Sequence, residues 1–129
     1  MSRRRLAALL SGASVNDGIR AFFKTVLDEL DDPRTPRVCL LAGSLSGDVL
    51  AERELKRYVL NEMTAFAGRF VERLESAKRT GELPKDFDTE VAAQVLFTYL
   101  QGLFRILGVL QNRAQVERHI EALLRGLGL

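Results

Sequence analysis

The chain has 129 residues, of which 47% are hydrophobic, 28% charged and 7% aromatic, a composition typical of one soluble globular domain. It excludes collagen-like, low-complexity and intrinsically disordered chains. Nineteen Lys and Arg against seventeen Asp and Glu leave a formal net charge of +2, which is too small to indicate nucleic-acid binding.

The first segments predict two helices. In residues 3–10, three arginines precede an apolar run that is too short for a signal peptide, so we expect a short helix there. Ser14 is a suitable N-cap for a second helix, in which apolar residues recur at intervals of three and four up to Leu30. Pro33 follows closely and ends this helix.

The middle of the chain predicts one short and one long helix. Residues 37–42 are apolar without a clear period and predict a short buried helix. The alternative is a strand, for which the chain offers no second strand to pair with. Residues 51–79 predict a long helix that is apolar on one side and is stopped at Gly81.

The last third of the chain predicts two helices that are unusually apolar. Asp88 caps residues 89–110, where apolar side chains cover roughly 200° of the helix, about twice the usual stripe. Arg105 near the middle of this segment argues for a buried helix and against a membrane span. Asn112 caps the last helix, which continues to about residue 127.

The expected fold is therefore all-α, an antiparallel bundle of five or six helices. The last two helices carry more apolar surface than so small a domain can cover by itself. A self-complementary face between two copies is the simplest arrangement that buries it, so we predict a homodimer through a four-helix bundle.

The residues needed for catalysis are scarce. His119 is the only histidine, Cys39 is the only cysteine, and no glycine-rich loop with a lysine forms a phosphate cradle. We therefore expect no enzyme, no metal site and no cofactor. A lone cysteine cannot form an internal disulfide, which is typical of a cytoplasmic protein.

Three features favour ligand binding over a plain core. Bulky, adaptable side chains could wall an apolar cavity, or could be ordinary core: Phe22, Phe23, Tyr58, Met63, Phe66, Phe70 and Tyr99. Glu62 and Arg105 lie beside apolar stripes, where they either pair with each other or with a charged effector, or reach water from the border of the stripe. Cys39 is either a sensor thiol or an inert core residue among apolar neighbours.

The order of these parts resembles the C-terminal effector-binding and dimerisation domain of TetR-family transcriptional regulators. The likeness spans nearly the whole chain. The residues that carry it are the Cys39-Leu40-Leu41 segment, the turn at residues 78–83 followed by the Asp88-capped helix, and Gln101-Gly102-Leu103.

The resemblance implies the sensor domain of a repressor, in which a small, mostly hydrophobic effector shifts the protein between two arrangements and so releases DNA. It implies an effector pocket formed by Phe22, Val26, Leu41, Tyr58, Glu62, Met63, Phe66, Phe70 and Tyr99. It implies a dimer interface formed by Leu96, Leu100, Phe104, Leu107, Ile120, Leu123, Leu124 and Leu127.

Residues 1–13 would be the remnant of the helix that links this domain to a DNA-binding domain, and residues 14–129 the sensor domain itself. The N-terminal helix-turn-helix domain of the family has no counterpart in this sequence, so we expect DNA binding only through a missing domain, and no membrane partner. The alternative is a stand-alone helical adaptor that binds a helix of another protein through the surface assigned above to the dimer.

Overall fold

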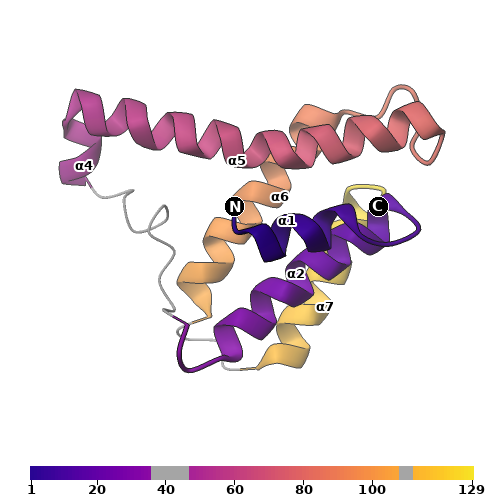
Figure 1. The fold of residues 1–129 in the computed structure, drawn as a ribbon, viewed down its shortest axis with the longest axis horizontal. Helices are drawn as coiled ribbons and strands as arrows, with labels where there is room; N and C mark the ends of the chain where they lie inside the picture. Colours follow the sequence, from indigo (N-terminus) through magenta and orange to yellow (C-terminus); the bar gives the residue numbers. More distant parts are fainter. Residues whose placement is uncertain (36–46, 108–111) are drawn as a thin grey trace.

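The computed structural model describes residues 1–35, 47–107 and 112–129. Within these ranges the chain forms helices and no strand (Figure 1). The helices are α1 (Arg3–Leu10), α2 (Val15–Asp31), α4 (Gly47–Ala51), α5 (Arg53–Thr80), α6 (Thr89–Ile106) and α7 (Arg113–Gly126). The prediction of an all-α bundle is confirmed.

The helix boundaries follow the capping residues. The side chains of Ser14, Asp88 and Asn112 each accept a hydrogen bond from the backbone N–H three residues later, at 3.1, 3.0 and 3.2 Å. Gly81 ends α5 with φ +80°, a left-handed conformation that glycine adopts without strain.

Three features of the structure differ from the predicted elements or cannot be compared with them. The α6 helix ends at Ile106, four residues before the expected end. The α4 helix was not predicted, because its five residues are too few to show a helical period and the first of them is a glycine. The helix predicted over residues 37–42 lies outside the described residues.

The core lies where α2, α5, α6 and α7 meet beneath the long α5 helix (Figure 1). The apolar residues that recur along α2 are all buried, which confirms the predicted inner face of that helix: Val15, Ile19, Phe22, Phe23, Val26, Leu27 and Leu30. The fully enclosed side chains include Leu9, Ile19, Phe22, Phe70, Leu74, Leu96, Leu100 and Leu124.

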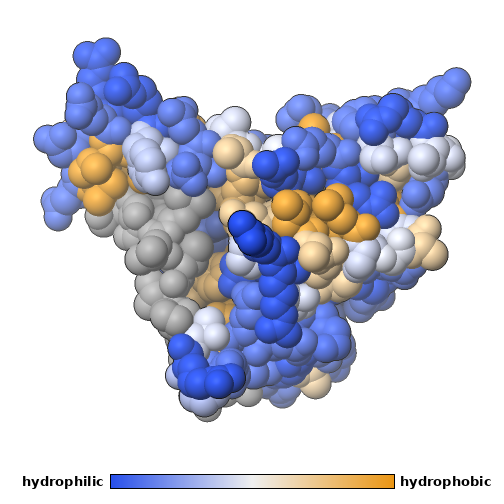
Figure 2. Space-filling model, viewed as in Figure 1, coloured by the Kyte–Doolittle hydropathy of each residue, from blue (hydrophilic) through white to orange (hydrophobic). Residues whose placement is uncertain are grey.

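The first half of α5 extends beyond this core. With 28 residues, α5 is about 42 Å long at 1.5 Å per residue, whereas the 17 residues of α2 span only about 26 Å. Tyr58 is 64% exposed and Leu60 58% exposed in this projecting half. Figure 2 shows a small apolar patch among hydrophilic residues at the end of the molecule where α4 meets α5.

The α1 helix packs closely against α2. Leu9 is fully buried, and a Cβ atom added to Gly18 would lie 2.4 Å from the Leu9 carbonyl oxygen and 3.0 Å from that of Ser11. Both of these atoms belong to the backbone and cannot turn aside as a side chain can. Only glycine therefore allows α1 to lie this close to α2.

We expect Gly18→Ala to lower the free energy of unfolding by about 1 to 3 kcal/mol, because the new methyl group separates the two helices. Gly68→Ala is the matched control, since a Cβ there meets nothing within 4 Å. Alanine should stabilise the interior of α5 by about 0.5 to 1 kcal/mol. Urea denaturation measures both values, and an unchanged midpoint for Gly18→Ala would show that the two helices separate at no cost.

Candidate functional site

Six aromatic side chains from α2, α5 and α6 form one cluster, which we call the aromatic cluster: Phe22, Phe23, Phe66, Phe70, Phe97 and Tyr99. The Phe22 ring lies at its centre, with centroids 5.1 Å from Phe70 and 6.5 Å from Phe66, both edge to face. The Phe66 ring in turn lies 5.5 Å from Phe97. The helices α2, α5 and α6, which carry every predicted effector residue except Leu41, therefore meet at these rings.

The structure brings part of the predicted effector set together. Phe22, Val26 and Phe70 are completely buried, and Met63 and Phe66 are partly buried beside them on α5. Sequence reasoning left Phe97 out of this set, although its spacing of four residues from Ala93 and three from Leu100 placed it on an apolar side of the helix.

The remaining predicted effector residues lie elsewhere. Tyr58 and Glu62 are exposed on the projecting half of α5, which the shorter neighbouring helices do not reach. Tyr99 contacts Phe23 at 5.7 Å but also lines a pocket on the outer side of α6, and its burial raises the pKa of the Tyr99 hydroxyl. Leu41 and the proposed sensor thiol Cys39 lie outside the described residues.

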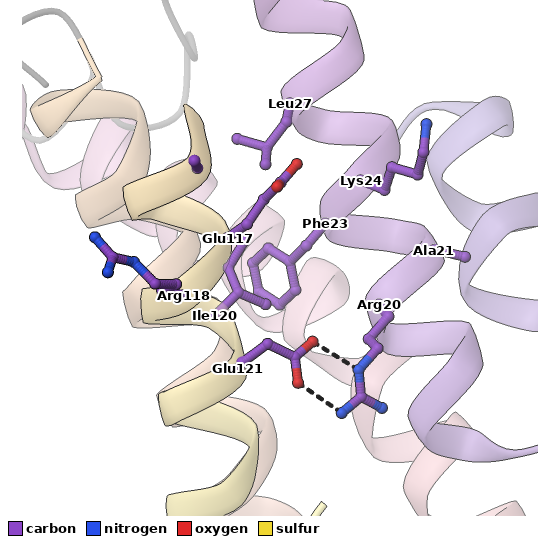
Figure 3. Close-up of a pocket in the computed structure, with 10 residues that line it drawn as sticks. Arg20, Ala21, Phe23, Lys24, Leu27, Glu117, Arg118, Ile120 and Glu121 are labelled. Atoms are coloured by element: carbon purple, nitrogen blue, oxygen red, sulfur yellow. Dashed lines mark hydrogen bonds and ion pairs between the residues drawn. The ribbon is translucent and has the colours of Figure 1, made fainter. Parts of the chain in front are cut away.

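A groove of about 470 Å³ separates α2 from α7 and was not predicted from the sequence. Figure 3 shows the Phe23 ring between the two helices, with Leu27 and Ile120 on either side of it. Ala21 and Ala114 are among the lining residues, and their short side chains leave the groove open. No sequence pattern could have found it, because it depends on how far α2 and α7 stand apart.

Ion pairs join α2 to α7 across this groove. Arg20 donates two hydrogen bonds to the Glu121 carboxylate, at 2.7 and 2.8 Å (Figure 3). Arg113, in the first turn of α7, pairs with Asp28 at 2.7 Å and with Asp31 at 2.6 Å. The hydrogen bond from Arg20 lowers the pKa of Glu121, and those from Lys24 and Arg113 lower the pKa of Asp28.

These lowered pKa values predict a loss of stability in acid. A carboxylate whose pKa is lower in the folded state stabilises the fold above its unfolded pKa of about 4, and this contribution disappears as the pH falls through the folded pKa. We therefore expect a constant melting temperature from pH 6 to 8 and a fall of several degrees below about pH 4. Glu121→Gln should reduce the size of that fall, whereas an identical pH profile in the variant would show that the pair with Arg20 contributes nothing.

The outer side of α6 carries apolar residues that the described chain leaves exposed or covers only in part. We call this side the outer face of α6, and it consists of Val91, Val95, Gly102 and Ile106. Val91 is 55% exposed and Ile106 is 50% exposed. A pocket of about 530 Å³ lies over its first half and reaches Leu123 on α7. A Cβ added to Gly102 would meet nothing within 4 Å, so the backbone is accessible there.

The predicted dimer interface requires a correction. Leu96, Leu100 and Leu124 have no exposed surface and Ile120 is 5% exposed, so these four residues belong to the core of the single chain. Phe104, Leu107, Leu123 and Leu127 are partly buried against that core. Leu96, Leu100 and Leu103 of α6 face the core of the chain, which leaves Val91 and Ile106 exposed on the outer face.

The polar residues singled out in the sequence occupy the surface. His119 is exposed. Glu62 and Arg105 are also exposed, which agrees with the alternative in which their charges reach water from the border of the apolar stripe. Among the described residues, no group of three His, Cys, Asp or Glu side chains could hold a metal ion. None of the described helices is long and apolar enough to cross a membrane.

Comparison with known proteins gave one result. A family model described as the tetracyclin repressor-like C-terminal domain matches residues 16–123 of the chain. A search of curated proteins found no match, and neither did a search of solved structures.

Proposed function

Because this chain belongs to the tetracyclin repressor-like C-terminal domains, which are parts of transcriptional regulators, we propose that it is the effector-sensing and homodimerisation domain of a TetR-like repressor. Domains of this family generally dimerise and bind small-molecule effectors. A regulator of this kind acts on DNA in the cytoplasm, where a lone cysteine stays reduced. The observation that carries the proposal is the uncovered outer face of α6.

The proposed dimer forms through the outer face of α6 and the adjoining edge of α7. Val91, Val95, Gly102 and Ile106 follow one another at intervals of four, seven and four residues, which keeps them on one side of the helix. Gly102 lets the α6 helix of a second copy approach closely, because no side chain stands between the backbones. Leu123 extends the apolar surface onto α7.

The proposed effector is a small, mostly hydrophobic molecule that binds among α2, α5 and α6. Phe22, Val26 and Phe70 supply the inner wall, and the partly buried Met63 and Phe66 supply the side from which a ligand enters. In the intact regulator, differential affinity of the effector for two arrangements of these helices would change the spacing of paired DNA-binding domains and release DNA.

Native mass spectrometry of the chain tests the dimer. We expect the mass of two 14.4-kDa chains, with additional mass where a small molecule is retained. A monomer with intact helicity at micromolar concentration would contradict the proposal and would favour the adaptor that binds a helix of another protein.

Thermal melts in the presence of a panel of neutral and anionic hydrophobic compounds test the effector site. A compound that binds the folded state raises the melting temperature by mass action. Met63→Ala should reduce that rise, whereas Leu60→Ala, at a 58% exposed position on the same helix, should not. A panel without effect on the unmodified chain, or an equal loss in both variants, would contradict the proposed position of the effector.

A further inference from the structure

The Arg5 side chain of α1 contacts two other helices, α2 and α6. The Nε atom of Arg5 lies 2.6 Å from the Glu29 carboxylate on α2, and the Arg5 guanidinium lies over the ring of Phe104 on α6, 5.3 Å from its centroid. The side chains of Arg5 and Glu29 are only 16% and 15% exposed. Because the pair is shielded from solvent, salt and water weaken these interactions less than they weaken a surface pair.

The Arg5 contacts matter because α1 cannot be stable alone. A helix of eight residues is too short to persist in water without tertiary contacts. Its C-terminal end is held against α2 by Leu9 and by the close approach at Gly18. Its N-terminal half contains Arg5, whose partners are one carboxylate on α2 and one ring on α6.

Phe104 connects this contact to the outer face of α6. It lies in the same last turns of α6 as Gly102 and Ile106 but on the opposite side of the helix, where its side chain is partly buried against the core. Any event that shifts the last turns of α6, such as the arrival of a second copy on Gly102 and Ile106, also moves the ring beneath Arg5.

We infer that Arg5 is a latch that couples the order of α1 to the position of the last turns of α6. The Glu29 carboxylate orients the guanidinium, and the Phe104 ring is the part of the latch that moves with α6. The coupling is reciprocal by thermodynamic linkage, so loosening either end loosens the other. The latch is a property of the single chain, and only the identity of the event that moves α6 rests on the proposed function.

Hydrogen exchange of the backbone amides tests the latch in the full chain without any ligand. Phe104→Leu keeps an apolar side chain but removes the aromatic face, and it leaves the Arg5–Glu29 pair in place. We expect amides of α1 to exchange about fivefold faster in this variant, the factor that corresponds to a cation–π contact of about 1 kcal/mol. Phe104→Tyr retains the ring and should keep the exchange of α1 at the rate of the unmodified chain.

The reciprocal variant is Arg5→Gln, which should speed exchange in the last turn of α6. Arg4→Gln is its control, because Arg4 is an exposed neighbour on the same helix. Unchanged exchange of α1 in Phe104→Leu would overturn the latch. Faster exchange throughout α2 and α5 in that variant would also overturn it, because the ring would then act only through general packing. Neither result depends on whether an effector binds or a dimer forms.

Discussion

Val91→Glu combined with Ile106→Glu is expected to convert the dimer into a folded monomer. The two residues lie 55% and 50% exposed in the single chain, so glutamate at either position costs the folded protomer little. In a dimer that packs through the outer face of α6, the same substitutions bring carboxylates from both copies into an apolar interface, where each lacks a partner. Sedimentation velocity should show one chain in place of two, with the helical circular dichroism spectrum retained.

Leu60→Glu serves as the matched control for this experiment. Leu60 is 58% exposed, similar to Val91, but lies on the projecting half of α5. We expect this variant to sediment as the unmodified dimer does. A double variant on α6 that remains dimeric would place the interface on another surface, and a monomeric Leu60→Glu would place it on α5.

The leucines predicted for the interface cannot be used to test it. The leucine stripe predicted for the interface suggests Leu100→Glu with Leu124→Glu as the dissociating pair. Both side chains are fully buried within one chain, so these substitutions place charges in the protomer core and should unfold it. The loss of mass would then be accompanied by a loss of helicity, which distinguishes unfolding from dissociation.

Phe22→Ala is expected to lower the free energy of unfolding by about 3 to 5 kcal/mol. The Phe22 side chain is completely buried and packs edge to face against Phe23 and Phe70, with centroids 5.4 and 5.1 Å away. Its removal leaves a void at the junction of α2 with α5. Urea denaturation measures the loss, which is a large fraction of the about 5 to 15 kcal/mol that typically stabilise a domain.

Phe66→Ala provides the comparison, because Phe66 belongs to the same cluster but is only partly buried. A half-covered ring buries less apolar area on folding than an enclosed one, so we expect its removal to cost only about 1 to 2.5 kcal/mol. Equal losses for the two variants would show that Phe66 is as tightly enclosed as Phe22, which would contradict an effector entrance at this side of the cluster.

The sequence predicted the elements well because their ends are decided locally. Three helices begin at a side-chain cap that bonds to the backbone three residues later, at Ser14, Asp88 and Asn112. The α5 helix ends at Gly81, which adopts a left-handed backbone conformation. The inner face of α2 was equally predictable, because all of its large apolar residues lie on one side of the helix.

The candidate site was predicted only in part, because it depends on which helices meet and how far they extend. The α6 helix is apolar on two sides, and periodicity alone does not say which side faces its own chain. Tyr58 and Glu62 continue the pattern of Phe66 and Phe70 along α5, yet the helices beneath end before they reach them. A repeating pattern in one helix carries no information about the lengths of its neighbours.

The overhang of α5 has a consequence for proteolysis. From Arg53 to Glu62 only Val59 is buried, so this stretch can unwind without disturbing the core, and a protease needs only such a local opening. Trypsin should therefore cut α5 first after Lys56 or Arg57, long before it reaches Arg73 or Lys78, which lie in the half that packs on the bundle. The same helix thus has an end that can be cleaved or lengthened at little cost and an end on which the whole domain depends.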